Sequence, residues 1–251
     1  MHRFKKPLSI VAAIFLILLI WQTAAWSLPD FLMPGVIKVV THLFYSMQQP
    51  EFYESLLGSL NRLGFGYGFA LLFGILLSLS ASLLGFFKDT LKSAIVILQS
   101  IPSIAWVPLF LILMGFGDTP IIVVVAIGAF YPIALSVMNA TENINKVHIK
   151  AAKNMGASPF SLLRRVYLPA VMPELITGAQ LAFGNAWRAL ISAEMLVGFS
   201  AGLGRDLAYA GEIANMLGVM ENILVIALLA AIIDLVVLEG LKRRVLKYRY
   251  L

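Results

Sequence analysis

Apolar residues dominate this chain in long runs, separated by short segments in which the polar and basic residues gather. A helix needs about 20 predominantly apolar residues to cross a lipid bilayer. Six runs are long enough and predict six membrane-spanning helices: 8–28, 63–84, 93–115, 119–139, 172–197 and 219–240. The first run follows a basic N-terminal segment. Because it is longer than the apolar core of a signal peptide, it is expected to stay on the protein as its first helix.

Two longer segments between these runs are less apolar. In segment 29–62 the apolar residues recur at helical spacing: Phe52, Leu56, Leu60 and, just beyond it, Leu63. That pattern predicts a helix lying at the membrane interface. Segment 198–218 is too polar to span and is predicted to form a loop and a short helix.

The composition agrees with an all-α protein embedded in lipid. Hydrophobic residues make up 60% of the 251 residues and charged residues only 13%, whereas soluble domains have about half and about a quarter. Cysteine is absent, which excludes disulfides and thiolate metal sites. We find no second domain, so 1–251 is expected to form a single transmembrane domain.

The net charge of +6 does not indicate a nucleic-acid partner, because the basic residues lie in clusters between the apolar runs. If both termini are cytoplasmic, 15 of the 19 Lys and Arg residues fall on the cytoplasmic side, as the positive-inside rule requires. The most basic internal loop, about 140–171, is then cytoplasmic as well.

Sequence patterns for catalysis and nucleotide binding are missing. The chain contains no phosphate-binding G-x-x-x-x-G-K-[ST] loop, no H-E-x-x-H and no G-x-S-x-G. Its three histidines are scattered, without carboxylates at ligand spacing, so no metal site is expected. We expect the chain to be neither an enzyme nor a cofactor carrier, and any energy from ATP to come from a partner.

The cytoplasmic loop has its own helix signals. Ser158 and Pro159 are typical of the first positions of a helix, and Gly156 favours a left-handed helix end. Two short helices joined at Gly156 are therefore predicted, the second ended by Pro169. Small apolar faces on them suit either lipid headgroups or a soluble partner protein.

The stretch "AAKNMGASPFSLLRRVYLPAVMP" resembles the EAA loop of binding-protein-dependent ABC importer permeases. The alanines at 151 and 152, Gly156, Val166 and Leu168-Pro169 fall at the family spacing, while Lys150 stands where the family has Glu. Stretches 59–78, 100–120 and 185–204 are similar to the nitrate, sulfonate and taurine branch of these permeases.

The resemblance implies the type I importer architecture: six helices and a cytoplasmic coupling helix, in the bacterial inner membrane. It also implies a second permease copy forming a homodimer, two cytoplasmic ATPase subunits that bind ATP and magnesium, and an external substrate-binding protein. Four residues take the ATPase-coupling role by position: Ala151, Ala152, Gly156 and Pro169. The apolar faces of the loop add three more: Met155, Phe160 and Leu163.

The fifth run carries charges, which are costly inside a membrane and usually face a cavity or a partner. Arg188 and Glu194 are too far apart to pair along one helix. One hypothesis places them on a translocation path, with Asn185 and Ser192 on the face of Arg188 and a small anion as cargo. The alternative is a structural ion pair with another helix. Trp106 either lines the path or packs.

A permease is one of three functions that we considered. An ion-coupled secondary transporter would leave the EAA-like loop unexplained, and an intramembrane enzyme would need a catalytic cluster that we do not find. For a permease, sulfonate, nitrate and bicarbonate are expected cargo, with neutral pyrimidine or flavin precursors as the alternative.

Overall fold

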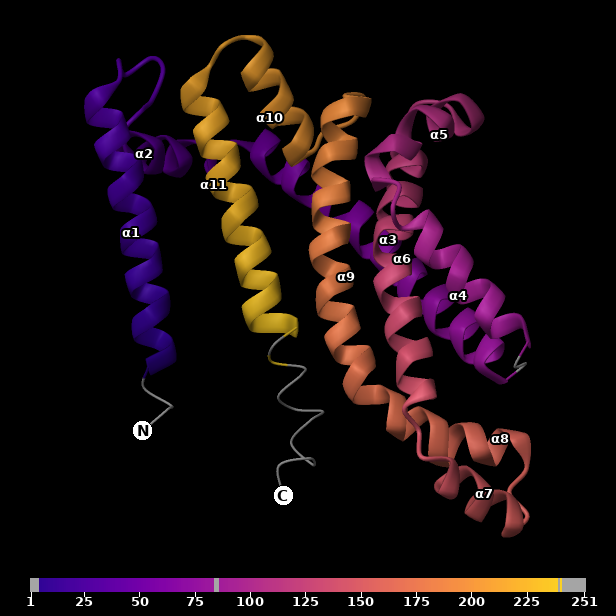
Figure 1. Ribbon diagram of the computed structural model, residues 1–251. Helices are drawn as coiled ribbons and strands as arrows, with labels where there is room; N and C mark the ends of the chain where they lie inside the picture. Colours follow the sequence, from indigo (N-terminus) through magenta and orange to yellow (C-terminus); the bar gives the residue numbers. More distant parts are fainter. Residues whose placement is uncertain (1–4, 84–85, 239, 241–251) are drawn as a thin grey trace.

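The computed structural model describes residues 5–83, 86–238 and 240, and this part of the chain is helical without any strand. Its centre is formed by α3 (Pro50–Leu83), α6 (Asp118–Glu142) and α9 (Leu168–Val197). In Figure 1, α6 and α9 run roughly side by side and α3 crosses behind them. The main core lies where these three helices meet, and most of its members are Ala, Val, Ile and Leu.

Small residues allow these helices to approach closely. A Cβ atom added to Gly178 of α9 would lie 2.1 Å from the Oγ atom of Ser136 on α6. One added to Gly66 of α3 would come within 2.7 Å of an α6 side chain. Gly64 and Gly68 have no atom within 4 Å of an added Cβ, so only Gly66 of the three alternating glycines is needed for close packing.

Four helices lie to one side of this centre: α1 (Lys5–Ser27), α2 (Val36–Ser46), α10 (Leu203–Glu212) and α11 (Met216–Ile232). Figure 1 shows α1 standing apart from the bundle. Its end is tied to α2, since the backbone N–H of Val36 donates to Oε1 of Gln22 over 3.2 Å. Trp21 also donates to the carbonyl of Pro34, just before α2, over 3.0 Å. The predicted loop and short helix at 198–218 are confirmed by α10.

The predicted interface helix around 52–63 is wrong. That segment and the second predicted span are one continuous helix, α3, which is 34 residues long. Leu63 is buried in the main core, and Phe52 and Leu56 pack against it. No proline interrupts the helix after its first residue, and a protein core rather than headgroups covers its apolar stripe.

The predicted single helix at 93–115 is also wrong. It is replaced by α4 (Phe86–Leu98), a 3₁₀ turn at Ser103–Trp106 and α5 (Val107–Met114). The two halves are bent by 91°. The break falls at Pro102, whose backbone ψ of 132° is extended, because a proline removes a helical hydrogen bond and disfavours helix in the residue before it.

The described residues therefore contain four helices that are long and apolar enough to span a membrane, or five if the bent pair counts as one span. The described apolar part of α1, Val11–Ser27, is shorter. The all-helical membrane architecture is confirmed, while the count of six spans is not.

Candidate functional site

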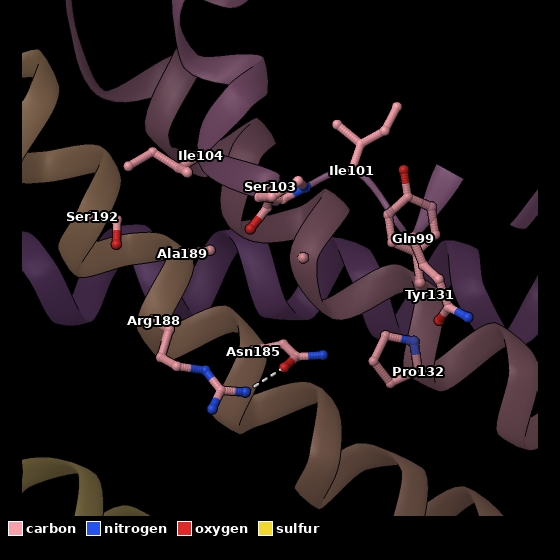
Figure 2. A pocket seen from close by; sticks show the side chains of 12 residues that line it. Gln99, Ile101, Ser103, Ile104, Tyr131, Pro132, Asn185, Arg188, Ala189 and Ser192 are labelled. Atoms are coloured by element: carbon pink, nitrogen blue, oxygen red, sulfur yellow. Dashed lines mark hydrogen bonds between the residues drawn. The ribbon is translucent and has the colours of Figure 1, made fainter. Parts of the chain in front are cut away.

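A pocket of about 320 Å³ lies between α9, α6 and the turn that follows α4. Figure 2 shows its side chains converging from these three elements. Six of the twelve lining residues carry polar side chains: Gln99, Ser103, Tyr131, Asn185, Arg188 and Ser192. The structure thus brings together three of the residues predicted for a translocation path, because positions 185, 188 and 192 share one face of a helix.

Arg188 gives the pocket its charge. It is exposed, and its Nη2 donates to Oδ1 of Asn185, one turn earlier on the same helix, over 2.5 Å. The lining residues include no Asp, Glu or second Lys or Arg. A pocket with one cationic group and several neutral hydrogen-bonding groups favours an anion over a cation.

Glu194 and Trp106, also predicted for the path, lie elsewhere. Glu194 is 1% exposed and pairs with Arg62 of α3, whose Nη1 lies 2.5 Å from its Oε1. Trp106 packs against the main core and does not line the pocket. The ion pair between helices thus exists for Glu194, whereas Arg188 has a neutral partner on its own helix.

The partners of Glu194 form a buried network at one end of α3, α6 and α9. Its carboxylate also accepts from the hydroxyl of Ser59, 2.8 Å away, and from the backbone N–H of Gly204, 3.0 Å away. Arg62 additionally reaches Asp118 at the start of α6, 2.8 Å away. Sequence reasoning had left Arg62 unassigned, although a single Arg at the edge of an apolar run calls for a buried partner.

The predicted cytoplasmic loop, about 140–171, has the predicted hinge. The first helix, α7 (Lys146–Asn154), ends at Gly156, whose φ is +78°. The backbone N–H of Ala157 then bonds the carbonyl of Ala152 over 3.0 Å, which is a Schellman-type helix end. The second helix, α8 (Pro159–Leu162), is capped as predicted, since the hydroxyl of Ser158 accepts from the N–H of Ser161 over 3.2 Å.

The sequence predicts that Pro169 ends this second helix, and that prediction is wrong. A π-helical turn at Leu163–Tyr167 carries the chain directly into α9, so Phe160–Val197 is one 38-residue helix. Pro169 lies in the first turn of α9. The wider π turn explains why the helix continues. Its backbone hydrogen bonds span five residues instead of four just before Pro169, which has no N–H to donate.

The apolar residues of the loop divide into two sets. Met155 is 88% exposed and Phe160 70% exposed, whereas Leu163 packs inward against a second core cluster. Between α7 and α8 lies a groove of about 510 Å³ whose lining includes Ala152, Met155 and Gly156. Figure 1 shows α7 and α8 at the far end of α9, away from α5 and α10.

Comparison with known proteins identifies the family of the chain. Residues 70–245 match the family described as "Binding-protein-dependent transport system inner membrane component". The taurine transport system permease protein of Escherichia coli strain K12 is 33% identical over 192 residues, covering 76% of this chain and 69% of that protein. A nitrate import permease protein of Synechococcus elongatus is 27% identical over 204 residues, covering 77% and 73%.

A solved structure shows the same fold. The methionine ABC transporter MetNI, in an inward-facing conformation, aligns with a TM-score of 0.63 and 23% identity, covering 78% of this chain and 98% of the matched chain. Relatives, family match and fold agree with the EAA-like loop. The chain therefore belongs to the family of binding-protein-dependent transport system inner membrane components, the multi-pass permease subunits of ABC transporters.

Proposed function

We propose that this permease conducts a small anion along the face of α9 that carries Asn185, Arg188 and Ser192. The observation that carries the proposal is the pocket between α9, α6 and the turn after α4, in which Arg188 is the one charged lining residue. A cationic group that is exposed to a cavity, and held by a neutral partner, keeps its charge available for a passing ligand.

Sulfonates and nitrate are the cargo that this pocket suits best. The relatives described above are named for the transport of taurine, which is a sulfonate, and of nitrate. Both ligands present oxygen atoms that a guanidinium can bind. A neutral pyrimidine or flavin precursor would leave Arg188 without a counter-charge. Bicarbonate, like sulfonate and nitrate, is a small anion with oxygen atoms and suits the pocket for the same reason.

The partners follow from the family and from the loop. We propose that two ATPase subunits bind the surface of α7 and α8, with Met155 and Phe160 as exposed apolar contacts and Ala151, Ala152 and Gly156 in the helix end between them. Leu163 and Pro169 would act by holding the loop on α9. A second copy of the chain and an external binding protein complete the importer.

A cysteine reporter tests the path directly, because the natural chain has no cysteine. The variant Ser192→Cys, in the assembled importer in lipid vesicles, is treated with an anionic methanethiosulfonate that carries a sulfonate group, or with its cationic trimethylammonium analogue. Neighbours four residues apart on a helix lie about 6 Å apart. At an effective dielectric of about 40, the charge of Arg188 then changes the rate at which a charged reagent reacts with the cysteine by about tenfold.

We expect the anionic reagent to react faster than the cationic one, and Arg188→Gln to lower the ratio of the two rates by at least about tenfold. Arg205→Gln, which alters an exposed arginine outside this pocket, is the matched control. Equal ratios with and without Arg188 would contradict the proposal. So would a cysteine that neither reagent reaches.

A further inference from the structure

Asn185 and Arg188, which both line the pocket, are joined by a hydrogen bond. The guanidinium has five N–H donors in one plane and no acceptor, so Oδ1 of the amide has to be the contact atom. That contact takes one donor of Nη2 over 2.5 Å. Figure 2 shows the amide nitrogen of Asn185 pointing away from Arg188, toward the side of the pocket where Pro132 lies.

The contact fixes a long side chain that is otherwise exposed. The long side chain of Arg has many rotamers, and a free arginine loses much of that freedom on binding a ligand. Held by Asn185, the group has already lost part of that freedom, and its remaining donors keep one planar orientation. Because Oδ1 is the acceptor, the amide nitrogen of Asn185 points to the Pro132 side of the pocket and takes no part in this contact.

We infer that Asn185 is a positioning residue, and that with Arg188 it forms a binding site for a planar or tetrahedral oxoanion with at least two oxygen atoms. This inference rests on the proposed anion path and goes further, since it names the geometry of the cargo. Two parallel N–H···O bonds fit a sulfonate or nitrate, whereas a halide has one centre and accepts at a single point.

The surroundings support this geometry. Ser103 and Ser192 add hydroxyl groups to the lining of the same pocket, and such groups can donate to an anion that moves through it. Among the residues that the structure describes, no carboxylate lines the pocket to compete for the guanidinium. The volume of about 320 Å³ holds a small organic oxoanion together with water.

The test measures how well anions protect the Ser192→Cys reporter in the assembled importer. Its rate of reaction with the anionic reagent is compared in sodium methanesulfonate and in sodium chloride of equal ionic strength. We expect methanesulfonate to slow the reaction about tenfold more than chloride, the difference expected from one more hydrogen bond to a charged group. In Asn185→Ala the two salts should differ by less than about twofold, because the guanidinium is no longer oriented.

Two further variants separate positioning from a general loss of structure. Asn185→Asp keeps the shape but sets a carboxylate against Arg188, so the preference for the anionic over the cationic reagent should disappear. Thr177→Ala, on α9 outside the pocket, should behave like the parent. Asn185→Ala should retain the charge preference, since Arg188 remains.

If methanesulfonate and chloride still differ about tenfold in Asn185→Ala, the positioning role is overturned while the anion path stands. If the parent reporter shows no charge preference at all, the proposed path itself fails, and this inference with it.

Discussion

The buried pair of Arg62 and Glu194 provides a quantitative prediction about what holds the buried network at this end of α3, α6 and α9 together. Arg62 is only 3% exposed, and in Glu194→Ala its guanidinium loses the closest carboxylate. Removing one partner of a buried pair costs about 3–5 kcal/mol, because the other charge stays buried. Asp118 still accepts from Nε of Arg62 over 2.8 Å, so we expect the free energy of unfolding to fall by about 3 kcal/mol, at the low end of that range.

The loss also leaves two neutral donors without an acceptor. The hydroxyl of Ser59 and the backbone N–H of Gly204 both bond Glu194 in the native protein. For a chain of about 250 residues, about 3 kcal/mol corresponds to a decrease of about 6–12 °C in melting temperature. Thermal unfolding of the purified permease, followed by circular dichroism in one detergent, measures this shift.

Glu212→Ala is the matched control, because Glu212 is exposed at the end of α10, and exposed substitutions usually change stability by less than about 0.5 kcal/mol. The double variant Arg62→Met with Glu194→Leu should unfold at a higher temperature than Glu194→Ala, since no buried charge is left unpaired. Asp118 also loses Arg62, but its side chain is 57% exposed. If Glu194→Ala melts together with Glu212→Ala, the reasoning about this network is refuted.

Two glycines lead to further predictions. Gly178→Ala should destabilise the permease by about 1–3 kcal/mol through overpacking against Ser136. The control Gly184→Ala, which has open space around the added Cβ, should not lower the melting temperature. Equal melting temperatures of the two variants would contradict the close approach of α6 and α9. Gly156→Ala places a side chain at φ +78°, which costs about 1–2 kcal/mol. We expect normal amounts of this variant in the membrane but ATP-driven uptake that is several-fold lower, whereas the control Gly211→Ala should leave uptake unchanged. Unchanged uptake in Gly156→Ala would exclude the hinge from coupling.

The sequence predicts best those elements that depend on local patterns. Three apolar runs became α6, α9 and α11 because nothing within them disrupts a helix strongly enough. The hinge at Gly156 and the cap at Ser158 were also predictable, since each depends on neighbouring residues only. The EAA-like spacing then indicated the family before any contact was known.

The errors arise where distant contacts decide. The pairing of Arg62 with Glu194 joins residues 132 positions apart, and neither residue identifies the other in the sequence. The stripe at 52–63, in the first part of α3, could face either lipid or protein, and periodicity alone does not tell which. Pro102 and Pro169 show the same limit, since one proline breaks a span and the other lies within a continuous helix.

We propose that this permease admits a small anion past Arg188, driven by ATP that a partner ATPase hydrolyses. ATP-driven uptake of labelled taurine, methanesulfonate and nitrate into vesicles that contain the complete importer measures it most directly. We expect at least one of these anions to enter only with ATP and the ATPase subunits, and Arg188→Gln to reduce that uptake at least about tenfold while the protein remains assembled. Uptake at the parental rate in Arg188→Gln, or uptake that needs no ATPase, would contradict the claim.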